Sequence, residues 1–436
     1  MCKAETATGV VELPAEATKA QDESEYHGLT NHNRFFSPDM TVKSIDASKE
    51  MIINGQVYDV STFLKRHPGG SIIKFQLGSD ASDAYNNFHV RSPKADKMLK
   101  ALPHRPADAS YQPDPLTQDY AKLYNELKAE GYFNPNPRHV AFRIAEVVAM
   151  YFAGITLIWN GWWWLGVLVA GVAQGRCGWL QHEGGHYSLT GNIKVDRHLQ
   201  MLIYGVGCGM SGCYWRNQHN KHHATPQKLG ADPDLQTLPL LAFHRIIGKK
   251  APKWWTAMQA PLFFLGPICT LVAWGWQFVQ HPNHALRVKN FMELFWMGLR
   301  YVLWHKAFGY MGVAAEMGLY MTYLGVGSTY IFVNFSVSHT HKDVIPKEKH
   351  ISWALYSANH TTNCSNHWFV NWWMAYLNFQ IEHHLFPSMP QYNHPIISPR
   401  VKALFEKHGV EYDVRPYLEC MRVTYLNLWK VGHYHQ

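Results

Sequence analysis

The order of apolar and polar positions divides the chain near Pro137. Before this proline the apolar segments are short. After it, long apolar runs occupy residues 140–159, 161–180, 261–280 and 311–337. A helix needs about 20 apolar residues to cross the ~30 Å hydrocarbon core of a bilayer. The pattern therefore predicts four transmembrane helices.

The number of crossings predicts which segments share a side of the membrane. Two predicted helices separate the N-terminal part from the His-rich stretch 182–223, and two more separate that stretch from a third His motif at 380–384. The shorter apolar stretch 291–304 is expected to lie in the membrane interface. Lys and Arg residues between 194 and 253 mark the shared side as cytosolic, although Arg287 and Lys289 fall on the other side. Both termini and all three His motifs are thus expected on the cytosolic side.

The part before Pro137 divides into three expected segments. Residues 1–40 have the composition of a disordered leader. Residues 41–105 form a compact unit, in which the Asn-Gly pair at 54–55 between alternating segments predicts a β-hairpin. The Pro- and Asp-rich stretch 106–137 is expected to be a linker. The membrane domain would then occupy residues 138–425.

Composition agrees with a membrane protein. Aromatic residues make up 14% of the chain and charged residues 17%, against about 25% charged residues in an average soluble protein. The net charge of +8 could attract nucleic acid or an anionic membrane surface. Since the chain has no Lys/Arg tract and no RNA-binding signature, we expect a membrane and no nucleic acid. The seven cysteines contain no CxxC pair, which is typical of structural thiols in a reducing compartment.

Three histidine clusters carry the candidate chemistry. The clusters are HEGGH, with His182 and His186, HNKHH, with His219, His222 and His223, and QIEHH, with His383 and His384. Residues three or four apart share one face of a helix, so each cluster can direct its imidazoles at one point. The clusters supply too many ligands for a single four-coordinate zinc, which predicts more than one metal ion. His339 or His341, after the fourth apolar run, could complete the ligand set, and we choose His341.

The N-terminal unit carries a second candidate site. His67 in HPGG and His89 in FHV are expected to be the two axial ligands of a haem that carries single electrons. Apolar residues around them could wall the haem pocket: Phe63, Leu64, Ile72, Ile73, Phe75 and Phe88. The stretch resembles cytochrome b5.

HEGGH also matches the HExxH motif of zinc proteases, in which Glu183 would be the general base. Two adjacent glycines favour a helix poorly, and a protease would explain neither the other two His clusters nor a haem. A membrane zinc protease is therefore the weaker hypothesis.

All the motifs together resemble the membrane-bound front-end fatty acid desaturases of the Δ5 or Δ6 type, which have an N-terminal cytochrome b5-like domain. The resemblance covers about residues 50 to 425. It includes Gln380 in place of His at the start of the third cluster, and the flank WWMAYLNFQIEHHLFPSMPQ. HEGGH departs from the HDxxH of many members, which leaves the role of Glu183 open.

The resemblance implies a mainly α-helical membrane protein with four transmembrane helices, a cytosolic His-box cap and a small α+β cytochrome b5-like domain. It implies an O2-dependent di-iron desaturase that inserts a cis double bond between an existing one and the carboxyl end, in polyunsaturated fatty acid biosynthesis. The implied cofactors are haem b and two non-haem iron ions bound by the box histidines. Glu183 and Gln380 would be the further catalytic residues. The implied partners are a fatty acyl substrate on CoA or phospholipid, O2 and NADH-cytochrome b5 reductase, at the endoplasmic reticulum membrane.

Chemistry supports this reading independently. An unactivated methylene has no acidic proton and no leaving group, so metal-activated oxygen must attack it. A neutral amide is a weak iron ligand, so we expect Gln380 to act beside the ligands or through a water. Within the same superfamily, a sphingolipid desaturase or a fatty acid hydroxylase is the alternative. A membrane-anchored electron carrier would belong to a different class.

Overall fold

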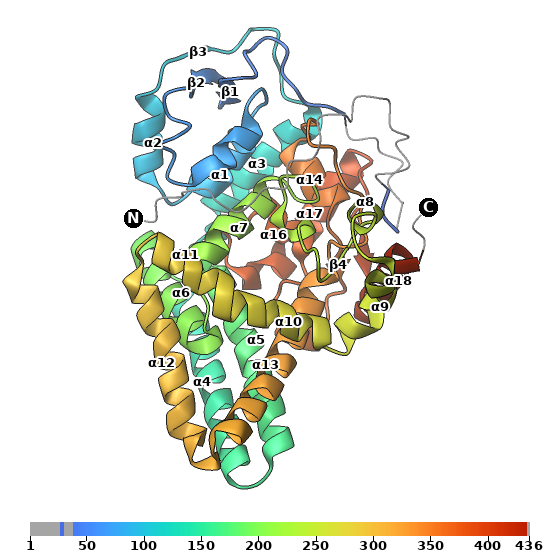
Figure 1. Ribbon diagram of the computed structural model, residues 1–436. Coiled ribbons are helices and arrows are strands. Elements are labelled where there is room, and N and C mark those ends of the chain that lie inside the picture. Colours follow the sequence, from blue (N-terminus) through green and yellow to red (C-terminus); the bar gives the residue numbers. More distant parts are fainter. Residues whose placement is uncertain (1–26, 30–37, 434–436) are drawn as a thin grey trace.

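The computed structural model describes residues 27–29 and 38–433, so the leader expected over residues 1–40 lies almost wholly outside the described residues. Figure 1 shows the N-terminal unit at the top, a middle layer of shorter helices, and four long helices that project below. The candidate ligands come from the N-terminal unit, from the middle layer and from the end of one of the long helices, which carries His182.

The N-terminal unit combines a small sheet with short helices. Strands β1 (Glu50–Ile53), β2 (Gln56–Asp59) and β3 (His104–Pro106) form an antiparallel sheet in that order. Asn54 and Gly55 connect the first two strands with φ values of 49° and 76°, a left-handed pair that Asn and Gly adopt readily. The predicted hairpin is confirmed. The helices of this unit are η2 (Gly70–Gln76), α1 (Ser82–His89) and α2 (Pro93–Lys100).

The stretch 106–137, expected as a linker, contains helix α3 (Pro115–Ala129). The Asp114 side chain accepts a hydrogen bond from the Thr117 backbone N–H at 3.1 Å, and Pro115 occupies the first turn. Buried Leu116, Tyr120 and Leu127 belong to one hydrophobic core with residues of the C-terminal part. The packing of α3 therefore attaches the N-terminal unit to the rest of the molecule, in addition to the covalent chain.

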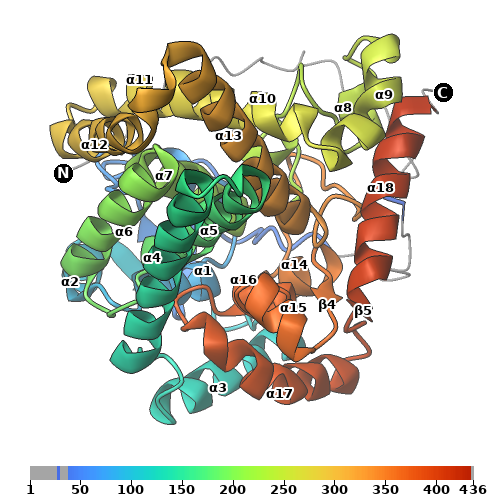
Figure 2. The ribbon, with the colours of Figure 1, turned by 90° about the horizontal axis from the view of Figure 1, so that it is seen from below.

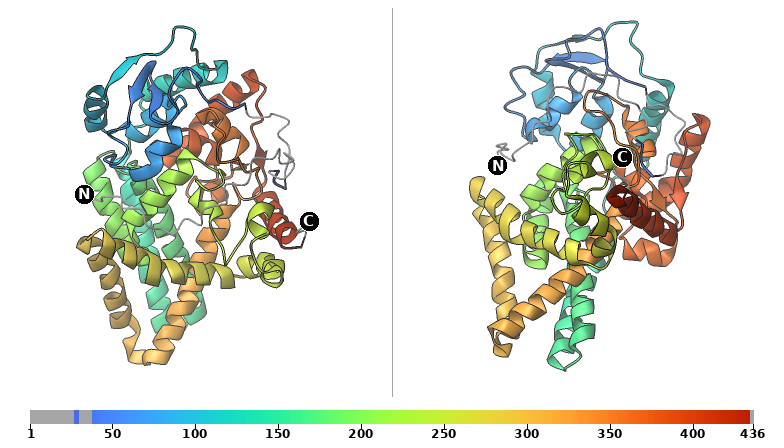
Figure 3. Two further views of the ribbon diagram at one scale, coloured as in Figure 1. Left: turned by 45° about the horizontal axis from the view of Figure 1, so that its top comes forward. Right: turned by 45° about the vertical axis from the view of Figure 1, so that its right-hand side comes forward.

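The four long helices are α4 (Pro137–Trp159), α5 (Trp163–Gly185), α12 (Phe291–Phe308) and α13 (Val313–Ser336). They form two hairpins whose turns lie at the end far from the N-terminal unit (Figures 1 and 3). A Cβ atom on Gly154 would lie 2.9 Å from the Ala170 Cβ, so this small residue lets α4 and α5 approach closely. Large apolar side chains are exposed on all four helices, among them Phe142, Phe152, Trp164, Phe295, Val302 and Met317.

The structure confirms the membrane prediction only in part. Among the described helices, α4 alone is long and apolar enough to cross a membrane, and one bent pair would count as a second span. This pair corrects the expected helix at 261–280, because α9 (Lys253–Phe264) meets the following helices at an angle of 93°. The bend lies at Gly266, whose φ of 104° is left-handed. The stretch 291–304, expected in the membrane interface, is instead part of the projecting helix α12.

The remaining elements form the middle layer. Figure 2 shows, from below, that α17 and α18 lie along the side of the molecule away from α6 and α12. The middle helices are α6 (Ile193–Cys208), α7 (Gly212–Ala224), α8 (Arg245–Gly248), α10 (Pro267–Gly275), α11 (His281–Arg287), α14 (Trp353–Asn359), α15 (Trp368–Trp373), α16 (Gln380–Leu385), α17 (His394–Lys407) and α18 (Tyr417–His433). Short elements are η3 (Pro233–Leu235), η4 (Trp276–Gln280), η5 (Gly309–Met311), η6 (Gln391–Asn393), and the paired strands β4 (Asn363–Cys364) and β5 (Val414–Arg415).

Candidate functional site

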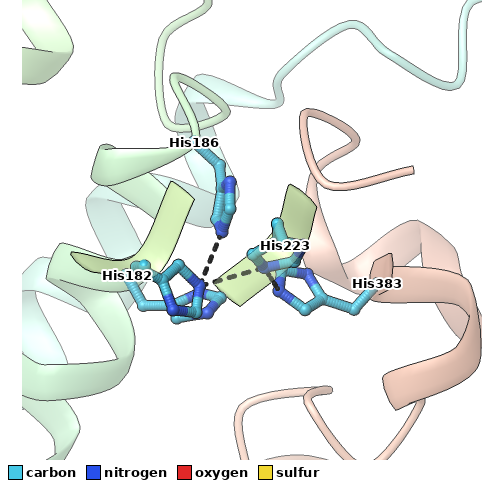
Figure 4. Close-up of side chains that lie close together, drawn as sticks. His182, His186, His223 and His383 are labelled. Atoms are coloured by element: carbon cyan, nitrogen blue, oxygen red, sulfur yellow. Dashed lines mark hydrogen bonds between the residues drawn. The ribbon is translucent and has the colours of Figure 1, made fainter. Parts of the chain in front are cut away.

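The three His clusters meet where α5 ends against α7 and α16. A first group brings together buried histidines from all three clusters, with possible ligand atoms within 4.8 Å of one another: His182, His186, His219, His223 and His383. Figure 4 shows His182, His186, His223 and His383 pointing toward a common centre. We call these residues the first His group.

The nitrogen positions of the first His group fit a metal ion. The Nε2 atom of His219 lies 3.0 Å from that of His186, and the Nε2 atoms of His223 and His383 are also 3.0 Å apart. Nitrogens that each bind one ion at about 2 Å lie about 3 Å from each other. Burial lowers the pKa of His186 to about 3 and that of His383 well below its usual value. The neutral imidazole, which is the form that binds a metal, is therefore favoured.

A second group lies beside the first and consists of His222, His339 and His384. Their ring centroids are 4.8 to 5.1 Å apart. The Nε2 atoms of His222 and His384 are buried and have no hydrogen-bond partner among the described residues. Buried polar atoms are almost always paired, so these two positions fit an ion. We call these residues the second His group.

Two contacts orient the rings of the second His group. His222 Nδ1 lies 3.0 Å from both carboxylate oxygens of Asp232, and His339 Nδ1 lies 3.0 Å from the carbonyl oxygen of His360. A proton on each Nδ1 satisfies these acceptors and leaves the Nε2 lone pair for a metal. Asp232 was not anticipated from the sequence, although an acidic residue close after the second His cluster is a signal that could have pointed to it.

The placement of His341 corrects our choice between the two candidates after the fourth apolar run. His341 Nε2 lies 3.1 Å from the Thr362 hydroxyl oxygen, outside both His groups, whereas His339 lies inside the second. Helix α13 ends at Ser336, so helical spacing no longer relates these two residues to the clusters. Their order in the chain alone could not decide which one turns inward.

Glu183 and Gln380 occupy different surroundings. Buried Glu183 pairs with Arg143 of α4 at 3.4 Å and accepts a hydrogen bond from the Gln391 backbone N–H at 3.2 Å. It therefore serves as the partner of a buried cation, which does not suit the general base of a zinc protease. The Gln380 side-chain nitrogen lies 3.0 Å from His339 Nε2, beside the second His group.

In the N-terminal unit, His67 and His89 face each other with ring centroids 6.2 Å apart. An iron bound to two imidazoles at about 2 Å each separates their nitrogens by about 4 Å. Since each centroid lies behind its nitrogen, the observed spacing fits an ion between them. The Nδ1 atoms lie 3.2 and 3.0 Å from the carbonyl oxygens of Gly70 and Tyr85, which leaves each Nε2 free to bind. Burial lowers the pKa of both rings, that of His67 to about 4.

The expected pocket walls are consistent with this site, with one exception. Phe63, Leu64, Ile72, Ile73, Phe75 and Phe88 are all half-buried. Phe88, however, packs its ring against Trp353 of α14, on the side of the unit that faces the middle layer.

Known proteins similar to this chain match both parts. The family described as fatty acid desaturase matches residues 158–416, and the family described as cytochrome b5-like heme/steroid binding domain matches residues 43–105. An acyl-lipid (8-3)-desaturase of Rebecca salina is 56% identical over 392 residues, which cover 88% of this chain and 92% of that protein. One from Thraustochytrium sp is 44% identical over 432 residues, covering 93% and 98%. Fatty acid desaturase 3 of Homo sapiens is 29% identical over 403 residues, covering 88% and 90%.

Proposed function

The chain belongs to the fatty acid desaturase family and carries a cytochrome b5-like domain, and on this premise we propose that it is a front-end Δ5 desaturase of acyl lipids. The observation that carries the proposal is the pair of adjacent, buried His groups, joined by the consecutive residues His222 and His223. We take carbon 5 as the position of the new double bond because two relatives are named (8-3)-desaturases. In such a name the difference, 8 minus 3, gives the carbon at which the bond is inserted.

We propose that the two His groups bind two non-haem iron ions and that His67 and His89 bind haem b. When bound, these groups supply oxygen activation and single-electron transfer, which side chains cannot provide. The first His group would hold one iron and the second His group the other, with Asp232 and the His360 carbonyl fixing the rings of the second. Burial of the histidines in both His groups keeps bulk water out of the iron site.

The two further residues would act on the site without binding iron directly. The Gln380 side-chain amide lies 3.0 Å from His339 Nε2, beside the second His group, and can orient a ligand, a water or the acyl chain there. Glu183 neutralises Arg143 and so fixes the end of α5 that carries His182 and His186.

We propose that α4, α5, α12 and α13 are the four membrane spans. The support is their shared direction, their exposed apolar side chains and the membrane family to which the chain belongs. An 18-residue helix such as α12 is about 27 Å long, close to the hydrocarbon thickness. The three parts of the chain would then have the expected limits, with the haem domain at 41–105, the connecting segment at 106–137 and the membrane domain at 138–425. The His groups and both termini would face the cytosol at the endoplasmic reticulum.

The proposed substrate is a polyunsaturated acyl chain carried on a membrane lipid, because two relatives are named acyl-lipid desaturases. An acyl chain on CoA is the alternative. Electrons would come from NADH through cytochrome b5 reductase to the haem domain, and O2 would be the oxidant.

The function can be tested by expressing the chain in a host that makes no polyunsaturated acids. The host is fed an acid with its first double bond at carbon 8, and lipid classes are analysed separately for the position of any new double bond. We expect a new cis bond at carbon 5 in phospholipids, and none with His383→Ala. A new bond at carbon 6, a hydroxylated product, or product first appearing on CoA would contradict the corresponding part of the proposal.

A further inference from the structure

The haem domain packs against the desaturase domain through the same helix that carries a haem ligand. Helix α1 ends at His89, and its residues Asn87 and Phe88 contact Ser388 and Trp353 of the middle layer. The Ser388 hydroxyl donates to the Asn87 carbonyl at 3.1 Å, and the Arg91 guanidinium donates to the Ser388 carbonyl at 3.1 Å. This face of the haem domain is therefore bound to the segment that directly follows the third His cluster.

A short route runs through this contact. Phe88 is covalently adjacent to His89, and its ring packs edge-on against Trp353, with centroids 5.8 Å apart at 84°. The Trp353 indole N–H donates to the Leu385 carbonyl at 3.1 Å. Leu385 is covalently adjacent to His384 of the second His group. One ring contact and one hydrogen bond thus connect a haem ligand with a ligand of the second metal position.

A second route avoids the aromatic contact. The Asn87 side-chain amide donates to the Tyr120 hydroxyl at 2.8 Å, and that hydroxyl donates to the Leu385 carbonyl at 2.7 Å. Trp353 and Tyr120 thus both hold the last carbonyl of α16, which has no partner within the helix. This bonding also serves to fix the helix, so a test must separate support of α16 from transfer of electrons.

We propose that Phe88 and Trp353 form the bridge by which electrons pass from the haem domain to the second His group. The inference rests on the proposed function, because it needs haem at His89 and iron at His384. Electron tunnelling weakens steeply across empty gaps, and the Phe88–Trp353 contact closes the gap between the domains with packed, conjugated rings. Both residues are positioning residues rather than catalytic ones, since they act through His89 and His384.

Electrons cross this bridge one at a time. Each transfer would oxidise one ferrous haem held by His67 and His89 and reduce one ferric iron held by the second His group, and neither ring would gain or lose an electron overall. The haem is reduced again by the NADH-dependent flavoprotein reductase. Two such transfers, one O2 and two protons account for one double bond and two waters.

The test is the rate at which haem is reoxidised in the purified holoenzyme. The haem is reduced without oxygen, the enzyme is mixed with O2 and phospholipid vesicles carrying a Δ8 acyl chain, and the haem visible band is followed. The rate in His384→Ala measures direct oxidation of haem by O2 and is subtracted. In Phe88→Leu we expect the remaining rate to fall about tenfold, which corresponds to ~1.4 kcal/mol of activation free energy.

Controls separate the bridge from simple support. Phe88→Leu leaves both hydrogen bonds to Leu385 in place, so iron per chain, the haem spectrum and the haem potential should not change. Phe88→Tyr retains a ring and should keep the wild-type rate. Phe133→Leu removes from the same core an aromatic ring whose ring contacts are with Tyr124 and Phe386, and its rate should also remain. If Phe88→Leu does not fold, Phe88→Met, which fills the same space without a ring and also leaves both hydrogen bonds to Leu385 in place, should slow reoxidation instead.

Failure of the bridge and failure of the proposed function would give different results. A Phe88→Leu rate within twofold of wild type, or an equal loss in Phe133→Leu, would overturn the bridge while leaving the enzyme's function intact. A wild-type protein without a haem band or without non-haem iron would instead contradict the proposed function.

Discussion

The contact between Asp232 and His222 shows how a residue outside the two His groups can control a metal ligand. Asp232 is fully buried and lies 3.0 Å from His222 Nδ1, while Asp234 lies 3.3 Å away with a side chain 46% exposed. Removing such a carboxylate partner of a metal-bound histidine typically costs about 10- to 100-fold in affinity or activity. Solvent weakens the contribution of the exposed carboxylate.

We therefore expect Asp232→Asn to lose iron from the second His group and most activity, and Asp234→Asn to lose much less. Iron per purified chain, measured with product formation, checks this prediction. Equal iron loss in the two variants would show that the direct Asp232 contact is not what orients His222.

His339 and His341 provide a second comparison of neighbouring residues. His339→Ala should lose iron, because it removes a nitrogen from the second His group. His341→Ala should keep most of its iron, since that ring contacts Thr362 outside both groups. Metal analysis of both variants distinguishes them, and the reverse pattern would restore the choice made from the sequence.

The sequence predicts the box histidines well for a physical reason. His219, His222 and His223 are three and four residues apart on one helix, so their relative directions follow from helical geometry. His339 lies beyond a helix end, and Asp232 reaches His222 from a loop. Their contributions depend on the path of irregular chain, which spacing does not determine.

Among the elements, α7 supplies ligands to both His groups, and its start is held by another helix. The buried Glu293 carboxylate of α12 accepts hydrogen bonds from the Ser211 hydroxyl and, at 2.8 Å, from the Cys213 backbone N–H. A carboxylate at a helix N-terminus satisfies free N–H groups and interacts favourably with the helix dipole. α12 thereby fixes the helix on which the metal site depends.

Glu293→Ala should lower the melting temperature and the iron content of both groups together. Leaving buried donors unpaired costs about 1–3 kcal/mol. Glu419→Ala is the matched control, because it removes a carboxylate from a surface pair with Arg422 and should change neither quantity appreciably. The prediction fails if iron is retained in Glu293→Ala at wild-type level.

The elements also show where hydrophobic patterning is insufficient. The apolar runs that become α4, α5 and α13 are correctly predicted as long helices. The run at 261–280 is equally apolar, but Gly266 and Pro267 break it. A Cβ on Gly266 would lie 2.4 Å from the Thr329 hydroxyl oxygen, so tertiary packing also requires glycine at this bend. The Gly-Pro pair is the sequence signal for this break, but the length of the apolar run favoured a continuous helix.

At the scale of the whole molecule, the proposed spans predict a topology. Tags at residues 20 and 430 should be accessible from the cytosol, and tags near residues 160 and 310, at the turns of the two projecting hairpins, should not. Selective permeabilisation followed by tag labelling measures this. A tag at 310 that is accessible from the cytosol would show that α12 and α13 do not span.

The central claim is that this one chain holds two non-haem irons in adjacent His groups and a haem in its N-terminal domain. The most direct test is quantitative metal analysis of the purified, active protein, with haem measured separately by its absorption. We predict two non-haem irons and one haem per chain, with one iron lost in His339→Ala and the haem alone lost in His67→Ala. Zinc in place of iron, or a single non-haem iron in fully active protein, would contradict the account.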